Sequence, residues 1–162
     1  MQMVRILVVY DSVSGNTELM AQAVAKGAEN VSQAEVALKR VNRVALKDML
    51  SSHAIIIGSP TYYGLMSARI KDLLDRSVKI HGKLEGKVGA AFTNSGETAS
   101  GAETTLLSII EAMLIHGMIV QGRHEEKHYG AAAVGKPSDK DRKLCEELGR
   151  RTAELAKAIF SE

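Results

Sequence analysis

The chain of 162 residues has one cysteine, two prolines and no tryptophan. With Cys145 alone it can form no internal disulfide bond and no thiolate metal cluster, and this fits a reducing compartment. We therefore expect a cytoplasmic location. No apolar run approaches the roughly 20 residues of a membrane span. The opening residues, MQMVRILVVYD, are predicted to form a strand rather than a signal peptide.

The net charge of the chain is also small. The 21 Lys and Arg residues nearly balance the 19 Asp and Glu residues, which leaves a formal charge of +2. Basic and acidic residues are interspersed along the chain rather than gathered into a block, so the charge pattern predicts no nucleic acid partner. The length suits one domain, and no internal repeat or linker interrupts it. We expect a single domain over residues 1–162.

What the chain does contain is an alternation of strand-like and helix-like segments. Short apolar runs predict strands, and amphipathic runs with apolar residues three and four apart predict helices. The strands are expected at 4–10, 34–41, 54–59, 87–94 and 118–121. The helices are expected at 16–29, 45–51, 67–78, 101–116 and from Ser138 onward, where Leu144, Leu148, Leu155 and Ile159 would share the buried face.

This alternation predicts an α/β fold with a parallel sheet between two layers of helices. Five strands suggest the order 2-1-3-4-5, with residues 34–41 nearest the sheet edge because they alternate more in polarity. In such a sheet a ligand binds beyond the carboxyl ends of the strands, at the switch point between the first and third. The segments that follow those strands are therefore the places to look for function.

The segment after the first strand runs D-S-V-S-G-N-T directly into a helix. The N-terminus of a helix offers free N–H groups and partial positive charge, so a phosphate can bind there without Lys or Arg. Gly15 lets the backbone turn closely around such a ligand. A plain polar turn with a helix cap is the alternative. No Gly-Lys-Ser/Thr follows and only one glycine is present, so a monophosphate is favoured over a triphosphate or pyrophosphate.

Two more polar segments are expected at the same edge of the sheet. After the third strand comes G-S-P-T-Y-Y-G-L-M, which places Tyr62 and Tyr63 where a flat heterocycle could stack. After the fourth strand comes T-N-S-G-E-T-A-S-G, whose main chain could wrap the polar end of such a ring. Each segment alone is an ordinary loop, but three on one edge indicate a cofactor site.

The S-V-S-G-N-T segment resembles the phosphate signature of the flavodoxins. The remaining loops resemble one branch of that family, the NAD(P)H:quinone oxidoreductases first described as tryptophan-repressor-binding proteins. The pieces S-P-T-Y-Y-G-L-M, F-T-N-S-G-E-T-A-S-G-A-E, H-G-M, H-Y-G-A and the final P-S follow that branch in order. The connection between the second and third strands is much shorter here. The resemblance implies a flavodoxin-like three-layer sandwich that binds FMN.

The resemblance also implies which residues would hold the FMN. Its phosphate would be held by Ser12, Ser14, Gly15, Asn16 and Thr17. The isoalloxazine ring would be lined by Pro60, Thr61, Tyr62, Tyr63 and Gly64, and its pyrimidine side and ribityl chain held by Thr93, Asn94, Ser95 and Gly96. His116 and Tyr129 fall where the branch places residues near the open face of the flavin. A histidine that simply ends a helix is an equal alternative for His116.

Two functions compete on this basis. One is an enzyme in which NAD(P)H, as co-substrate, reduces FMN and a quinone or other small acceptor takes two electrons. The other is an electron carrier that serves a redox protein partner. Carrier flavodoxins are strongly acidic, and a chain at +2 lacks that field, so we favour the reductase. The resemblance leaves a homodimer and a homotetramer open as assemblies.

Two further patterns are given no function. Residues 124–128 spell H-E-E-K-H, which matches a zinc protease motif, but that motif requires a helix and this segment follows a strand and Gly122. We therefore expect a solvated polar loop and no metal site. Cys145 lies beside Leu144 in the last helix and is expected to be a packed thiol.

Overall fold

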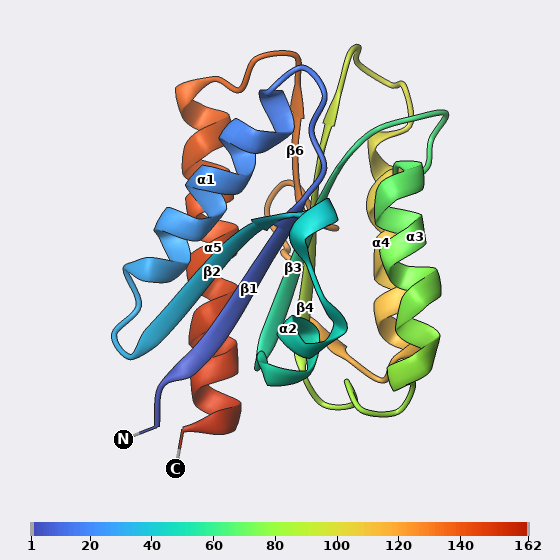
Figure 1. Cartoon of the computed structure of the whole chain (residues 1–162). Coiled ribbons are helices and arrows are strands. Elements are labelled where there is room, and N and C mark those ends of the chain that lie inside the picture. The colour runs from blue at the N-terminus through green and yellow to red at the C-terminus, as the bar shows by residue number, and fades with distance from the viewer. Residues whose placement is uncertain (1, 162) are drawn as a thin grey trace.

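The computed structural model describes residues 2–161 and consists of a parallel sheet between two layers of helices (Figure 1). The strands are β1 (Val4–Tyr10), β2 (Ala34–Arg40), β3 (Ala54–Pro60), β4 (Val88–Ser95), β5 (Ile119–Val120) and β6 (Ala131–Val134). The helices are α1 (Asn16–Glu29), α2 (Leu46–Ser51), α3 (Ala68–Arg76), α4 (Ala102–Ile115) and α5 (Asp139–Phe160), with 3-10 turns η1 (Val41–Arg43) and η2 (Ser77–Ile80).

The order of the sheet is β2-β1-β3-β4-β5, which confirms the predicted order. Strands β3 and β4 are buried throughout, because helices cover both of their faces and an uninterrupted apolar run suits such a position. Strand β2 alternates in burial and lies at the edge, as its mixed sequence predicted. The first and third strands are neighbours, so the expected switch point lies between β1 and β3.

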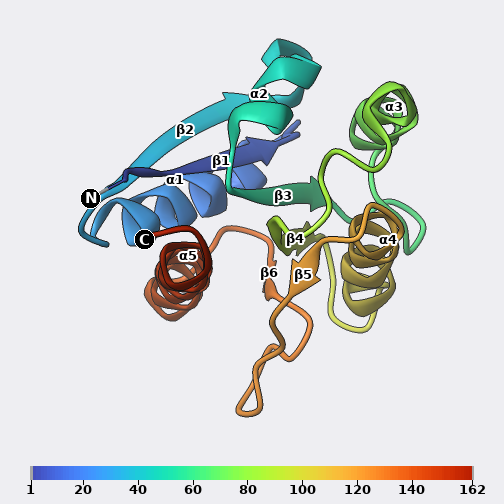
Figure 2. The ribbon, with the colours of Figure 1, turned by 90° about the horizontal axis from the view of Figure 1, so that it is seen from below.

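The fifth strand differs from the prediction, because it is split in two. Its first part, β5, pairs with the beginning of β4, where Val88 lies opposite Ile119. Its second part, β6, pairs with the end of β4, from Phe92 opposite Ala131 to Ser95 opposite Val134. The chain between them, residues 121–130, leaves the sheet as a loop, which projects downward in Figure 2. The sequence analysis predicted only the first part.

The two faces of the sheet are covered by different helices (Figure 2). One apolar core lies under α1 and α5 and takes Ile6 and Val8 from β1. The other lies under α2, α3 and α4 and takes Leu7 and Val9 from the same strand. Alternate residues of a strand point to opposite faces, so β1 contributes to both cores.

Helix α5 begins as predicted but buries a different face. Ser138 Oγ caps it by accepting a hydrogen bond from the Asp141 amide, and the Asp141 carboxylate accepts one from the Ser138 amide, which completes a capping box. The predicted buried leucine stripe is wrong at its ends, since Leu144 is only half-buried and Ile159 is exposed. The face packed on α1 carries the small residues Cys145, Gly149, Thr152, Ala153 and Ala156. These small side chains allow the two helices to approach closely.

Cys145 is fully buried, as expected, and burial raises the pKa of its thiol to about 12. Within residues 2–161, no helix is both long enough and apolar enough to cross a membrane. Because the strands are parallel, the segments that follow β1, β3 and β4 meet at one edge of the sheet, where the chain enters α1, α3 and α4.

Candidate functional site

The first loop, residues 11–15 between β1 and α1, turns sharply at Gly15. There φ is +95°, a conformation that glycine adopts at little cost. The Gly15 amide donates to Ser12 Oγ over 3.1 Å, so the Ser12 hydroxyl oxygen holds the loop closed. The helix that follows has no side-chain cap, although hydroxyl-bearing residues surround its start. An uncapped helix N-terminus beside a hydroxyl-rich loop is an arrangement that suits an anion.

The donors in this loop are not used by the protein. Among residues 2–161, no protein group accepts a hydrogen bond from the amides of Ser14, Asn16 or Thr17. Thr17 is 3% exposed, yet its hydroxyl has no protein partner in the same range. The Thr17 hydroxyl oxygen is not among the fully buried polar atoms that lack a partner, so it keeps contact with solvent beside the amides. These free donors suit a phosphate.

The second loop, residues 61–67 between β3 and α3, contains a tight reverse turn at residues 62–65, which we call the tyrosine turn. Tyr62 and Leu65 exchange two backbone hydrogen bonds of 3.0 Å, and the residues between them, Tyr63 and Gly64, have φ of +51° and +74°. Positive φ at both central positions is the pattern of a type I′ turn, which explains the Gly at the second position. Tyr63 stands fully exposed at the tip, and Tyr62 is half exposed. An aromatic ring is thus presented to solvent at the expected crevice.

The third loop, residues 96–101 between β4 and α4, offers main-chain donors. Within the described part of the chain, the amides of Gly96, Glu97 and Thr98 donate to no protein group. The side chains before them are already engaged. Thr93 Oγ1 donates to the Ser59 carbonyl (2.7 Å), Asn94 Nδ2 to the Gly135 carbonyl (2.7 Å), and Ser95 Oγ to the Glu97 carbonyl (3.0 Å). The side chains of these three predicted site residues are therefore already used by the protein, and the free donors of this loop are the amides that follow them.

The second and third loops are joined to each other. Thr61 Oγ1 lies 2.8 Å from Thr93 Oγ1, and because Thr93 already donates to Ser59, Thr61 is the donor in this pair. The Thr61 amide donates to the Asn94 carbonyl over 2.8 Å. At the top of α4, a Cβ on Gly101 would lie 2.5 Å from the Gly64 Cα, so the two loops touch. The site is thus held in place before any ligand arrives.

Comparison with known proteins places this geometry in a family. Residues 43–125 match the family model described as NADPH-dependent FMN reductase. A flavodoxin of Aquifex aeolicus is 37% identical over 96% of this chain and 88% of its own length. An NAD(P)H dehydrogenase (quinone) of Archaeoglobus fulgidus is 36% identical over 97% of this chain and 100% of its own. The chain belongs to the NADPH-dependent FMN reductase family. The predicted resemblance is confirmed.

Solved structures agree with this assignment. A WrbA-like flavodoxin from Agrobacterium tumefaciens superposes with a TM-score of 0.84 at 28% identity, over 96% of this chain and 99% of that one. The flavodoxin-like fold of this family member is therefore confirmed. The matched segment of the reductase model includes the second and third loops but not the first, which the full-length relatives cover.

One predicted site residue lies far from the loops. His116 ends α4 at its C-terminal side, whereas the candidate site is at the N-terminal side, about 21 Å away along a helix of 14 residues. It follows that His116 cannot reach a ligand held by the loops of its own chain. Within one chain of this reductase-family protein, the helix-end alternative describes His116, and a place near the flavin stays a prediction.

The surroundings of His116 explain its state. Ser77 Oγ donates to the Leu74 carbonyl (2.6 Å), so the 2.7 Å contact between His116 Nε2 and Ser77 Oγ has the imidazole as donor. Nδ1 is then unprotonated, and it is buried with no partner among residues 2–161. Burial, and secondarily the neighbouring His81, lower the pKa of His116 below its usual value.

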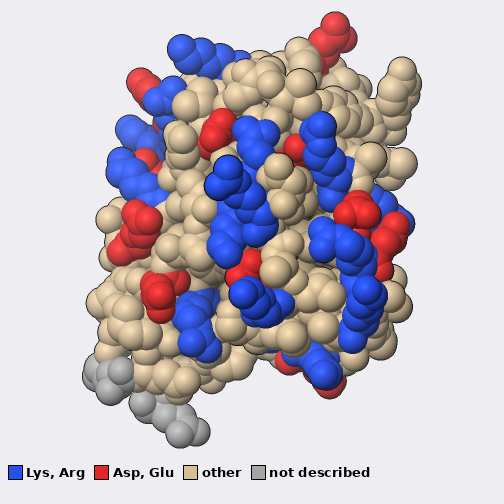
Figure 3. Space-filling view, viewed as in Figure 1, with Lys and Arg blue, Asp and Glu red and all other residues tan. Residues whose placement is uncertain are grey.

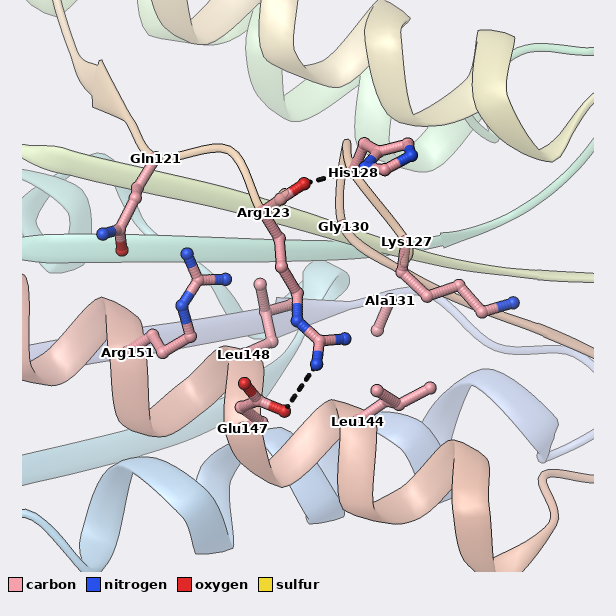
Figure 4. Close-up of a pocket in the computed structure, with 10 residues that line it drawn as sticks. All are labelled: Gln121, Arg123, Lys127, His128, Gly130, Ala131, Leu144, Glu147, Leu148 and Arg151. Atoms are coloured by element: carbon pink, nitrogen blue, oxygen red, sulfur yellow. Dashed lines mark hydrogen bonds and ion pairs between the residues drawn. The ribbon is translucent and has the colours of Figure 1, made fainter. Parts of the chain in front are cut away.

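Tyr129 lies nearer to the loops. It is half exposed and lines a pocket of about 290 Å³ with Glu103 and Leu106, in the first two turns of α4. Residues 124–128, with the zinc-like H-E-E-K-H sequence, form part of the loop between β5 and β6 and not a helix; Figure 4 shows two of them, Lys127 and His128. The two histidines therefore lack the helical spacing that the metal motif requires.

Sequence reasoning missed an ionic link beneath the first loop. Asp11 is buried, and its Oδ1 pairs with Arg69 Nη1 over 3.3 Å, while Oδ2 has no partner in the described residues. Arg40 donates to the Ser12 carbonyl over 2.8 Å. The predicted sheet order could have indicated both Asp11 and Arg40 as site residues. Asp11 follows β1 and Arg40 ends β2, so each lies at the edge of the sheet formed by the carboxyl ends of the strands.

Proposed function

We propose that this chain binds FMN and acts as an NAD(P)H:quinone oxidoreductase. One observation carries the proposal, namely the uncapped N-terminus of α1 behind a loop whose amides and Thr17 hydroxyl have no protein partner. Family membership and the NAD(P)H dehydrogenase (quinone) relatives support it. When bound, FMN supplies the redox chemistry, since it accepts hydride from NAD(P)H and passes two electrons to a quinone.

The chain itself binds and orients the cofactor. The first loop would hold the phosphate through its amides and through the hydroxyls of Ser14 and Thr17, with Ser12 keeping the loop closed. Tyr62 and Tyr63 would form an aromatic wall for the ring. The free amides after Ser95 would hold the polar edge of the ring, and the Thr61–Thr93 pair would fix the distance between these two loops.

Acceptor, location and assembly complete the proposal. The acceptor is a quinone or another small electron acceptor, and the location is cytoplasmic. A homodimer or homotetramer is supported by exposed apolar side chains that line the groove between α3 and α4, among them Val78 and Ile115. Light scattering during size-exclusion chromatography measures this assembly directly.

An anaerobic visible spectrum of the FMN-loaded protein tests the activity. We expect NADH or NADPH to bleach the flavin band and benzoquinone to restore it. An electron carrier is the second candidate function, supported by the flavodoxin relatives. In that case neither nicotinamide bleaches the band, whereas dithionite does. Absence of FMN binding would refute the proposed site.

Substitution of Thr17 by Val tests the phosphate assignment. The change preserves the shape of the side chain and removes one hydroxyl, so we expect FMN to bind about 10-fold more weakly. Riboflavin, which lacks the phosphate, should bind wild type and variant equally in a fluorescence titration. Thr152→Val on α5, whose hydroxyl donates to the Leu148 carbonyl, is the matched control and should leave FMN affinity unchanged.

A further inference from the structure

Basic and acidic residues are unevenly divided between two parts of the chain. Residues 34–87 contain ten Lys and Arg against five Asp and Glu, whereas the rest of the chain contains eleven against fourteen. The basic segment forms the edge strand β2, the buried strand β3 and the helices α2 and α3, and these two helices cover the same face of the sheet. Figure 3 shows Lys and Arg gathered over this side. The small net charge therefore conceals a basic face.

We define the basic face by its exposed cations Arg43, Lys47, Arg69, Arg76 and Lys79. Two of them are already paired, Arg69 with Asp11 and Arg76 with Asp72 (2.9 Å). In the described part of the chain, Arg43, Lys47 and Lys79 have no carboxylate within 4.0 Å. These three cations lie on η1, α2 and η2, so the free charge is spread over separate elements.

The basic face reaches the rim of the candidate flavin site. Arg69 is in the first turn of α3, directly after the tyrosine turn, and its partner Asp11 precedes Ser12 of the first loop. Arg40 donates to the main chain of that same loop. A partner bound to this face would therefore lie beside the tyrosine turn.

The pattern of free cations favours a broad partner over a small anion. A phosphate needs several donors that converge on one point. Here the guanidinium groups of Arg69 and Arg76, which share a groove of about 240 Å³, are engaged by carboxylates of the chain, and that volume is below the usual range for ligand pockets. Separated exposed cations instead complement an extended acidic surface.

We propose that the basic face docks an acidic electron-transfer protein that exchanges single electrons with the flavin site beside it. The proposal rests on FMN binding, but not on quinone as the acceptor. Oxidation of one NAD(P)H to NAD(P)⁺ releases one proton and two electrons, so two molecules of a one-electron acceptor are reduced for each NAD(P)H consumed. Carrier flavodoxins use the opposite polarity, an acidic surface that meets basic partners.

Two one-electron acceptors of opposite charge test this surface, namely plastocyanin, an acidic copper protein, and cytochrome c, a basic haem protein. The FMN-loaded chain is reduced with dithionite, freed of excess reagent and mixed anaerobically with each acceptor. At low salt we expect rapid reduction of plastocyanin, slowing as ionic strength rises, and the reverse salt dependence for cytochrome c. Because dithionite replaces NAD(P)H, this result does not depend on the proposed reductase activity.

A charge-reversed triple variant, Arg43→Glu, Lys47→Glu and Lys79→Glu, should slow the reduction of plastocyanin at least 10-fold at low salt. The matched control is Lys140→Glu, Lys143→Glu and Arg150→Glu on α5, which lies across the sheet from α2 and β2 (Figure 2). It makes the same change in net charge and should slow the reaction far less. Both variants should reduce benzoquinone at the wild-type rate.

Binding supplies a second measurement that needs no electron transfer. Titration of oxidised plastocyanin into the ¹⁵N-labelled, FMN-loaded chain should shift amide resonances within residues 34–87 and in the tyrosine turn. Equal slowing by the two triple variants would overturn the proposal, because it would show a response to net charge alone. Shifts confined to α5, or an unchanged plastocyanin rate in the first variant, would also overturn it.

Discussion

The two helical layers of this molecule are built in opposite ways. Helices α1 and α5 meet at Gly27 and Gly149, where an added Cβ would lie 1.8 Å and 1.9 Å from a backbone oxygen of the facing helix. Helices α3 and α4 instead leave an open groove of about 540 Å³ between them, lined by Met66, Leu74 and Ile115. One layer is closed to the limit of backbone contact, and the other exposes apolar side chains.

The difference corresponds to what each layer supports. The closed layer carries the first loop, whose donors must stay fixed to hold a small charged group. The open layer carries the tyrosine turn, and it closes only at the top, where Gly64 touches Gly101. Close backbone packing therefore serves the anion site, while the looser layer leaves surface free for contacts with other molecules.

The closed layer should be broken most severely by Gly149→Ala. The added methyl group would meet the Val24 carbonyl, so α5 must move away from α1, and we expect a loss of about 2–3 kcal/mol in the free energy of unfolding. Urea denaturation measures it. Gly96→Ala adds the same methyl group where nothing lies within 4 Å and should change stability little. Wild-type stability in the Gly149 variant would show that the helices are not in such close contact.

In the open layer, His116 at the end of α4 should make the free energy of unfolding depend on pH. Its folded-state pKa lies below the unfolded value of about 6.5, so below that pH the unfolded state binds more protons. Stability should therefore fall as pH drops from about 6.5 toward the folded-state pKa, by at most about 1.4 kcal/mol per pH unit for each such histidine. His53, whose pKa burial also lowers, adds to the same slope.

The variant His116→Gln should reduce that slope without abolishing it, as measured by urea denaturation between pH 5 and 7. Replacement of the exposed His124 by Gln is the control and should retain the wild-type slope. An unchanged slope in the His116 variant would mean that its imidazole is not desolvated in the folded chain.

The smallest effect is expected on the exposed rim of the open layer. Val78 and Ile115 are 70% and 73% exposed, so Val78→Ser and Ile115→Ser should each change the free energy of unfolding of the monomer by about 0.5 kcal/mol or less. If this rim joins copies of the chain, light scattering should show a smaller assembly in these variants. A loss above about 1 kcal/mol in the monomer would contradict the exposure seen here.

Much of this architecture could be predicted from sequence, because strong local patterns specify it. The alternation of apolar and amphipathic runs predicted the strand order, which is confirmed, while the anion site predicted from the hydroxyl-rich segment Ser12 to Thr17 stays a prediction. The strand β6 was missed because A-A-A-V is short, only one of its residues is β-branched, and it follows a polar loop. Its pairing with β4 is a long-range contact that no local pattern encodes.

The other failures also concern relations between distant segments. Leu144 and Ile159 have the spacing of a buried stripe, but the close approach of α1 admits only small residues on that face of α5. His116 follows the expected motif, yet α4 carries it to the opposite edge of the sheet. The excess of basic residues within 34–87 can be counted in the sequence, but their placement on one face depends on the contact of η1 with α3 and of α2 with η2, which no local pattern encodes.

The division of the fifth strand has a consequence for how such a chain can diversify. Residues 121–130 span a stretch that only Ala90 and Ala91 cover in β4, and pairing resumes at Ala131 as if the strand had continued. Because the pairing on either side fixes the register, residues can be inserted or deleted between Gln121 and Tyr129 without shifting the sheet. The wall beside Tyr129 and Glu103 can thus be remodelled over evolution while the first loop, which follows β1, keeps its geometry.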